Sequence, residues 1–288
     1  MRKIKNFIFI CSVFVLFSVS IFIFFTNKSD TEIIPVLTYH NIEPSPSIKK
    51  ITYSIDDSKF EKHIKKLKEM GYNTIVFSDL EDRDEKTEEI RTSEQKNIMI
   101  TSDDGKMNNY LYMYPAMEKY SMRGNLFIIG RKVDDGDEEY MGKDEIKTVL
   151  DSGLFEIGSH SFNLHHKKED IPVICRMDGE TEDSYRTRIY EDISMSKELL
   201  EDRFETEITA FAYPYGVSTE ESAEILEKIG IENAFTTDLG ITPEKSEDER
   251  YIRKRINVDG FCSERRLIFQ IELFKRIAVL EYKLSQII

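Results

Sequence analysis

The stretch Asn97-Ile-Met-Ile-Thr-Ser-Asp-Asp-Gly105 carries the pattern that decides the fold. Its apolar part, residues 97–101, is short and bounded by polar residues, which predicts a β-strand. Two adjacent carboxylates, Asp103 and Asp104, follow that run directly. The segment therefore predicts a strand that delivers two acidic side chains just past its C-terminal end.

Strand-like and helix-like patterns alternate on both sides of this stretch. We expect further strands at residues 33–39, 73–77, 125–129, 154–158, 209–213, 234–237 and 250–258, and helices at 58–70, 109–120, 143–151, 183–204 and 219–229. This alternation predicts an α/β fold with a parallel sheet and helical crossovers. About seven such units favour a distorted (β/α) barrel, with an open doubly wound sheet as the alternative.

Polar side chains gather at one place in this predicted fold. His40, Asp103, Asp104, His160 and Pro214 all fall at or just after the C-terminal ends of predicted strands. In (β/α) barrels that end of the strands is the catalytic face. The grouping therefore predicts a functional site there.

The N-terminus carries a different signal. Phe7 to Phe25 is a run of 19 residues without a charge, preceded by Arg2, Lys3 and Lys5. About 20 apolar residues cross a bilayer, and the preceding cations keep the N-terminus in the cytoplasm. We expect one N-terminal transmembrane helix that holds an extracellular catalytic domain at the cell membrane. A cleaved signal peptide, which would leave a secreted protein, is the alternative.

The chain of 288 residues divides into three expected parts: a cytoplasmic stub and anchor at 1–30, a catalytic domain at 31–262 and a C-terminal amphipathic helix at 263–288. We expect that helix to pack on the barrel exterior, and a dimer contact or a membrane-surface helix is the alternative. Its apolar stripe comprises Leu273, Ile277, Leu280, Leu284 and Ile287, widened by Leu267, Ile271 and Phe274.

Composition narrows the functional classes. The net charge of −14 argues against a nucleic-acid partner, because such proteins need a basic surface. Two cysteines, Cys175 and Cys262, lie outside the anchor and could pair. No Cys-x-x-Cys motif is present, so a zinc site built from thiolates is not expected.

Carboxylates and imidazoles together suit metal-assisted hydrolysis. One Asp and two His side chains can bind a divalent ion and leave a position for water. Hydrolysis of an amide also needs a base, a group that stabilises the oxyanion, and an acid for the leaving amine. The residues at the predicted strand ends can fill these roles.

From about Ile33 to Asp259 the sequence resembles the NodB-type polysaccharide deacetylases, carbohydrate esterase family 4. The family's Asp-Asp-Gly motif implies that Asp103 is the catalytic base and Asp104 a metal ligand. Its histidine motif implies that His160 is the second ligand.

The second histidine of that motif is displaced in this chain. Leu164 stands at the usual position, so the resemblance makes His165 the third ligand and His166 its backup. The wider spacing is similar to the branch that deacetylates poly-N-acetylglucosamine. The implied cofactor is a divalent metal, expected to be Zn²⁺, although cobalt, nickel or iron suit the same donors.

The segment Phe211-Ala-Tyr-Pro-Tyr-Gly216 resembles the family's third motif, in which the amide after the proline helps to bind the oxyanion. That role falls on the backbone N–H of Tyr215. The motif's usual arginine is replaced by Ala212, so another residue must orient Asp103. Arg253 or Arg255 is the candidate.

The remaining role is that of the general acid, which protonates the leaving amine. The family's late histidine motif is missing, and in the biofilm branch an N-terminal histidine takes its place, which implies that His40 is the acid. Ser102 replaces a common phenylalanine, a change without an interpretation from sequence. His63 lies on a charged helix and is expected to face solvent.

The expected function is metal-dependent N-deacetylation of an N-acetylglucosamine-containing cell-surface polysaccharide, with release of acetate. The missing arginine and the displaced histidine motivate an alternative, a non-catalytic protein that binds polysaccharide through the same fold. A glycosidase with paired carboxylates is disfavoured, because its two acids lie across the sugar from each other and are not adjacent in sequence.

Overall fold

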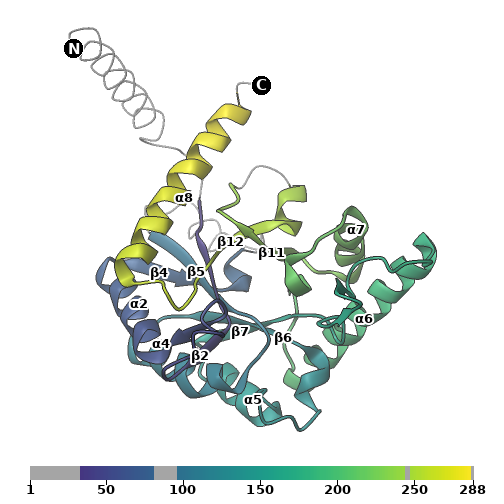
Figure 1. Ribbon diagram of the computed structural model, residues 1–288, viewed down its shortest axis with the longest axis horizontal. Coiled ribbons are helices and arrows are strands. Elements are labelled where there is room, and N and C mark those ends of the chain that lie inside the picture. Colours follow the sequence, from purple (N-terminus) through teal and green to yellow (C-terminus); the bar gives the residue numbers. More distant parts are fainter. Residues whose placement is uncertain (1–32, 81–95, 244–246, 287–288) are drawn as a thin grey trace.

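The computed structural model describes residues 33–80, 96–243 and 247–286 as a ring of parallel strands with helices around it (Figure 1). The strands are β1 (Val36–Tyr39), β2 (Asn41–Glu43), β3 (Ser54–Asp56), β4 (Tyr72–Ile75), β5 (Lys96–Ser102), β6 (Gly124–Ile128), β7 (Phe155–Ser159), β8 (Lys167–Lys168), β9 (Ile171–Pro172), β10 (Ala210–Ala212), β11 (Asn233–Leu239) and β12 (Arg253–Asn257). The α-helices are α2 (Asp57–Glu69), α4 (Tyr114–Lys119), α5 (Lys143–Asp151), α6 (Glu182–Phe204), α7 (Glu220–Ile229) and α8 (Glu264–Ser285).

Hydrogen bonds between β1 and β5 close the sheet into a barrel. The strand order β1-β12-β11-β10-β7-β6-β5 returns to β1, and every one of these pairings is parallel. The predicted (β/α) barrel is therefore confirmed, and the open sheet is wrong. The strand expected near residues 73–77 is present as β4, but it pairs only with the first half of β5, from Lys96 to Met99, and is not one of the seven strands whose pairings close the ring.

The transmembrane helix predicted at residues 7–25 lies outside the described residues. Among the helices that are described, none combines the length and apolarity needed to cross a bilayer.

Residues on β5 alternate between two cores, which explains its uninterrupted apolar run. Met99 belongs to a compact cluster with Phe77, Phe127 and Phe235, whose ring centroids lie 5.0–5.9 Å apart. Ile98 and Ile100 belong to the larger cluster that includes the buried faces of the helices. Because successive side chains of a strand point to opposite faces, both faces of β5 are covered.

Helix α8 packs against α2 and the apolar core through the first part of the expected stripe, together with Ala278. Leu267, Ile271 and Ala278 are buried, whereas Leu273 is 36% and Leu284 50% exposed. Ser263 begins the helix by accepting a hydrogen bond from the Arg266 N–H. The four- and three-residue spacing predicted the helix, but not which part of the apolar stripe meets the barrel.

Several short features had no sequence prediction. Strands β2 and β3 form a separate parallel pair, and β8 and β9 an antiparallel one. Each is two or three residues long, too short to produce a periodic pattern. The cysteines Cys175 and Cys262 are both free thiols in the structure.

The expectation that His63 faces solvent is wrong, because its side chain is fully buried. Its Nε2–H donates to the carbonyl oxygen of Cys262 at 3.2 Å, which leaves Nδ1 to accept from the Tyr39 hydroxyl at 3.2 Å. The histidine thus joins α2 to β1 and to the segment before α8. Burial lowers the pKa of His63 to about 4.

This buried histidine makes stability depend on pH. Unfolded His63 binds a proton near pH 6.5, but the folded protein resists protonation down to about pH 4. The free energy of unfolding should therefore fall as the pH drops through this window, by up to about 1.4 kcal/mol per pH unit from this residue. Urea denaturation of chelator-treated protein should show a steeper pH dependence for wild type than for His63→Gln. Equal slopes would contradict the assignment.

Candidate active site

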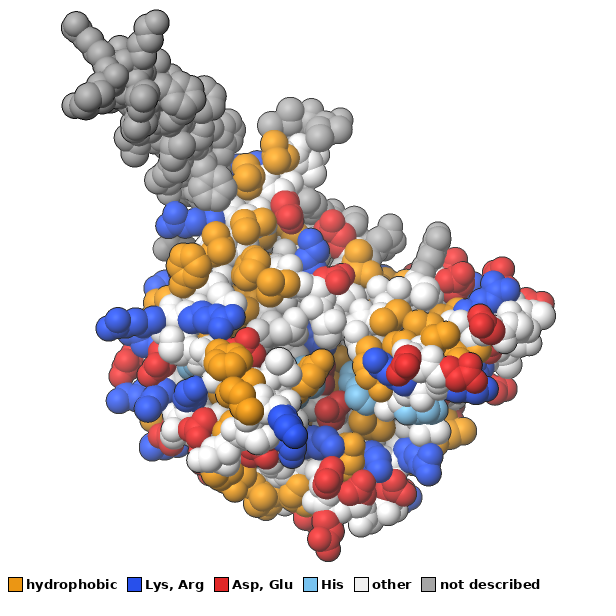
Figure 2. Space-filling model, in the orientation of Figure 1, with side chains coloured by type: hydrophobic (Ala, Val, Ile, Leu, Met, Phe, Trp, Pro, Cys, Tyr) orange, Lys and Arg blue, Asp and Glu red, His pale blue; other side chains and the backbone are white. Residues whose placement is uncertain are grey.

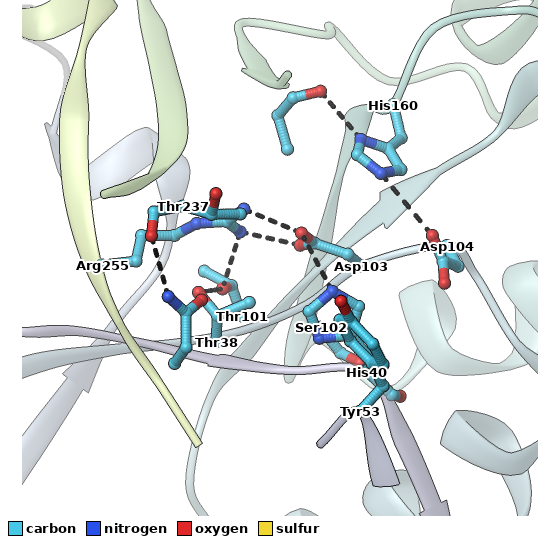
Figure 3. Close-up of polar contacts among 12 residues, drawn as sticks. Thr38, His40, Tyr53, Thr101, Ser102, Asp103, Asp104, His160, Thr237 and Arg255 are labelled. Carbon is cyan, nitrogen blue, oxygen red and sulfur yellow. Dashed lines mark hydrogen bonds and ion pairs between the residues drawn. The ribbon is translucent and has the colours of Figure 1, made fainter. Parts of the chain in front are cut away.

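The two adjacent carboxylates after β5 point in different directions because of the backbone between them. The Asp103 N–H still donates to the Tyr39 carbonyl at 3.1 Å, continuing the β1–β5 ladder. Asp104 then takes a left-handed conformation with φ of 75°, uncommon outside glycine, and Gly105 follows with φ of 68°. Asp103 is therefore directed at Arg255 and His40, and Asp104 at His160 (Figure 3).

Asp103 forms a buried, bidentate ion pair with Arg255. The two guanidinium nitrogens lie 2.7 Å from the two carboxylate oxygens, and the side chains are 0% and 2% exposed. Burial by itself raises the pKa of Asp103, but the charge of Arg255 and its two hydrogen bonds outweigh burial and hold that pKa well below its ordinary value. Asp103 is thus kept as a carboxylate.

Of the two arginines considered from sequence, the structure pairs Arg255 with Asp103. The Arg255 Nε donates to the Thr236 carbonyl at 2.8 Å, which fixes the guanidinium across the barrel interior. Arg253 instead donates to the Asn233 side chain at 2.9 Å. Arg253 and Arg255 lie two residues apart and therefore share one face of β12, so the deciding fact is which of them lies within reach of Asp103. Arg255 does, and it takes the place of the motif arginine.

Asp104, His160 and His165 converge on one point. One donor atom from each lies within 4.8 Å of the others, with Asp104 Oδ1 at 3.6 Å from His160 Nε2 and 3.4 Å from His165 Nε2. Asp104 Oδ1 is buried and has no hydrogen-bond partner among the described residues. One carboxylate oxygen and two imidazole nitrogens are a donor set that fits zinc, and a bound ion would satisfy the unpartnered oxygen.

The surroundings of His160 and His165 favour metal binding by both side chains. The His160 Nδ1–H donates to the Ala212 carbonyl at 2.8 Å, so the lone pair on Nε2 faces Asp104. For His165, burial first and then the charge of His160 lower the pKa to about 4. A neutral imidazole at neutral pH can bind a metal. His166, the proposed backup, is exposed and lies outside this group.

His40 lies on the other side of Asp103 from Arg255 (Figure 3). Its Nε2 is 3.9 Å from Asp103 Oδ2, and its side chain is 21% exposed, so it can meet both the carboxylate and a bound molecule. The His40 carbonyl accepts from Ser102 Oγ at 3.1 Å and from Asn109 Nδ2 at 2.8 Å. The unexplained Ser102 therefore holds the backbone of His40, which a phenylalanine could not do.

Tyr215 completes the site from the end of β10. It has a left-handed backbone with φ of 58° in the turn Pro214–Gly216, and its ring stacks on His165 with centroids 4.8 Å apart. The Gly216 N–H already donates to the Tyr213 carbonyl at 2.8 Å, whereas the Tyr215 N–H lies at the start of the turn, has no acceptor within it and can donate to a bound molecule. Gly216 is needed there, because a Cβ would collide with Thr237.

Sequence reasoning missed Asn109 and Tyr53. Tyr53 is 63% exposed and lies edge-on to His40, with ring centroids 5.7 Å apart. Neither residue belongs to a motif: Asn109 begins the helical turn Asn109–Met113 that follows Asp104, and Tyr53 directly precedes β3, which pairs with β2 just after His40. On the surface, histidine side chains show beside a hollow in which acidic side chains are visible (Figure 2).

The family model described as polysaccharide deacetylase matches residues 90–234, half of the chain. The chain therefore belongs to the polysaccharide deacetylase family, as the motifs predicted. The matched region contains Asp103, Asp104, His160, His165 and Tyr215.

Individual relatives agree with this placement. YxkH of Bacillus subtilis (strain 168) is 28% identical over 207 residues, which cover 72% of this chain and 65% of YxkH, just under two thirds of its length. The poly-beta-1,6-N-acetyl-D-glucosamine N-deacetylase of Staphylococcus aureus (strain N315) is 25% identical over 215 residues, covering 73% of this chain and 70% of that protein.

Solved structures show the same fold. A polysaccharide deacetylase from Bacillus cereus, BC0361, superposes with a TM-score of 0.69 at 24% identity, over 84% of this chain and 69% of that one. IcaB from Ammonifex degensii gives a TM-score of 0.69 at 22% identity, over 84% of this chain and 97% of that one.

Removing the charge of Arg255 should destabilise the protein strongly. Arg255→Gln leaves the Asp103 carboxylate buried without a counter-charge, which costs about 3–5 kcal/mol of unfolding free energy. Chemical denaturation at pH 7 measures this loss, and adding Asp103→Asn to the variant should recover part of it.

A matched control is Arg203→Gln, which breaks the surface ion pair with Asp134. Its cost should stay below about 1 kcal/mol. A loss for Arg255→Gln no larger than that of the control would show that the buried pair does not constrain the barrel.

Proposed function

We propose that the protein is a metal-dependent N-deacetylase that hydrolyses the acetamide of an N-acetylglucosamine-containing cell-surface polysaccharide and releases acetate. The observation that carries the proposal is the convergence of Asp104, His160 and His165 around an unpartnered buried oxygen, with the ionised Asp103 beside them. Membership of the polysaccharide deacetylase family supports the same reaction class.

The substrate class rests on the relatives and on the histidine spacing. The Staphylococcus aureus relative is named for deacetylation of poly-beta-1,6-N-acetyl-D-glucosamine. The five-residue step from His160 to His165 resembles the same branch. We therefore favour poly-N-acetylglucosamine over peptidoglycan and chitin-like polymers, which share the acetamide.

Asp104, His160 and His165 would hold the divalent ion, for which we propose zinc. Such an ion, when bound, lowers the pKa of a bound water molecule and polarises a carbonyl oxygen. The two histidines and the carboxylate supply two nitrogen donors and one oxygen donor, which leaves room for water and substrate.

The chain's own groups account for the proton transfers. Asp103, held as a carboxylate by Arg255, accepts a proton from the water that attacks the acetamide carbon. The Tyr215 N–H donates a hydrogen bond to the oxygen that becomes negative. His40 gives a proton to the departing nitrogen as the C–N bond breaks, so acetate and a free amine are the products.

The geometry favours catalysis over polysaccharide binding alone. The alternative was motivated by the missing motif arginine and the displaced histidine. Arg255 now stands beside Asp103, and His165 reaches the same point as His160 and Asp104. The missing motif arginine and the displaced histidine are therefore both compensated, by Arg255 and His165. A glycosidase is disfavoured as before, since Asp103 is occupied by Arg255 and Asp104 faces two histidines.

The location of the enzyme remains a proposal from sequence. We propose that residues 7–25 anchor the protein in the cell membrane with the catalytic domain outside, where such polysaccharides are found. Association through α8 also stays a prediction, supported by the exposure of Leu273 and Leu284.

Acetate release tests the proposed reaction directly. Zinc-loaded protein should release acetate from poly-N-acetylglucosamine, and Asp103→Asn should reduce the rate by at least about 100-fold because the base is lost. Treatment with a chelator should abolish release, and added zinc should restore it. An enzyme-coupled acetate assay measures each rate.

The matched control is Asp202→Asn, which removes an exposed carboxylate from α6 and should leave the rate unchanged. Full activity in the chelated protein would contradict the metal-dependent mechanism. Binding of several N-acetylated polymers without any acetate release would favour the non-catalytic alternative.

A further inference from the structure

Helix α6 presents a polar stripe to the segment that carries the two metal-binding histidines. Arg188, Asp192 and Ser196 are spaced four residues apart, so they lie on one side of the helix. Each contacts part of residues 159–175, which run from the end of β7 past β9. The proposed reaction assigns no role to these three side chains.

Asp192 makes the central contacts. Its Oδ1 accepts from the Phe162 N–H at 2.8 Å and its Oδ2 from the Asn163 N–H at 2.9 Å. Both donors lie in the short loop between His160 and His165. A carboxylate that accepts two adjacent backbone N–H groups fixes the orientation of both peptide planes.

The other backbone N–H groups of that loop also have hydrogen-bond acceptors. The His160 N–H donates to the Ile128 carbonyl at 2.8 Å, and the Leu164 N–H to Ser161 Oγ at 3.1 Å. The Ser161 N–H donates to Ser159 Oγ, which in turn donates to Ser196 Oγ at 2.8 Å. Every N–H from residue 160 to 164 therefore has an acceptor, and α6 provides the two at the centre.

The loop needs this support because its backbone is unusual. Ser161 adopts a left-handed conformation with φ of 68°, which a non-glycine residue takes only when its surroundings hold it there. That turn is what brings His165 back towards His160, to a ring-centroid separation of 4.7 Å. Without the bonds to Asp192, the loop would have more freedom to separate the two imidazoles.

Arg188 extends the same support to the other side of His165. Its guanidinium donates to the Val173 carbonyl at 2.7 Å and to the Cys175 carbonyl at 3.0 Å, and it pairs with Glu180 at 2.8 Å. The Val173 N–H in turn donates to the His166 carbonyl at 3.0 Å. The stripe thus bonds the chain both before and after His165.

We propose that Asp192 is a positioning residue for the metal site: its carboxylate fixes the 161–164 loop so that His160 and His165 present their Nε2 atoms to one point before an ion arrives. This inference rests on the proposed function, which makes these histidines metal ligands. Preorganisation of this kind strengthens binding, because the ion does not have to order the loop.

Zinc affinity tests the role without using activity. Competition with a chromophoric chelator measures the Kd of Zn²⁺ for wild type, Asp192→Asn and Glu191→Gln. Asparagine has nearly the same shape but turns an amide towards one of the two N–H donors, so Kd should rise about tenfold or more. Glu191→Gln removes the same charge from the exposed neighbouring position and should leave Kd within about twofold.

Amide hydrogen exchange gives a second measurement on the wild-type protein, which matters if Asp192→Asn does not fold. In the metal-free protein the Phe162 and Asn163 amides should exchange slowly, because Asp192 already holds them. Fast exchange of both amides without metal, or an unchanged Kd in folded Asp192→Asn, would overturn the role of Asp192 alone. Wild-type protein that binds no zinc at all would overturn the proposed function together with this inference.

Discussion

The bidentate ion pair between Asp103 and Arg255 is the contact on which the mouth of the barrel depends. It joins the end of β5 to β12, and both strands pair with β1, where the barrel closes. Two fully buried charges gain little net stability from each other compared with apolar side chains. Breaking the pair is costly, however, so the contact fixes which way Asp103 points and keeps it ionised.

The interior of the barrel has an apolar part and a polar part, and the polar part surrounds Asp103. Aromatic rings of Phe77, Phe127 and Phe235 fill one part of it, as an ordinary apolar core does. The part near Asp103 instead contains Arg255, Thr38 and Thr101, with Thr101 Oγ1 donating to the Leu37 carbonyl at 2.9 Å. Polar groups are buried there with their hydrogen bonds satisfied, which is the condition for keeping a charge in such a place.

Asp103 and Asp104 are adjacent in sequence but have different surroundings. Arg255 takes both oxygens of Asp103, whereas Asp104 turns away through its left-handed backbone and leaves Oδ1 facing two imidazoles. The Asp103 carboxylate is thus paired with the fixed charge of Arg255 and lies near His40, whereas the Asp104 carboxylate remains free to bind the proposed metal ion. The roles proposed for Asp103 and Asp104, base and metal ligand, could not be exchanged without changing the backbone between them.

The sequence predicted those parts that depend on local pattern. Alternating apolar runs placed all of the ring strands, and the strand ends placed His40, Asp103, Asp104, His160 and the turn at Pro214 together. What it could not predict depends on contacts between distant segments. Burial of His63 follows from its packing against Tyr39 and Cys262, and the part of α8 that is covered follows from where that helix meets α2.

The residues that hold the site in place, Arg255 and Asp192, could not be singled out from sequence either, because they also act through contacts between distant segments. Arg253 and Arg255 share one face of β12, so only their positions along that strand, set by its register against β1 and β11, decide which one reaches Asp103. Asp192 belongs to a long helix with a generally polar sequence, where one acidic residue resembles the next. Asp192 differs from the other acidic residues of α6 only because the loop between His160 and His165 passes beside it.

The central claim is that one ion is shared by Asp104, His160 and His165. A crystal of the zinc-loaded protein, measured by anomalous diffraction at the zinc edge, tests this most directly. The account predicts a single strong peak at about 2.0–2.2 Å from Asp104 Oδ1 and from the Nε2 atoms of both histidines. A peak bound by other residues, or no peak at these three side chains, would contradict it.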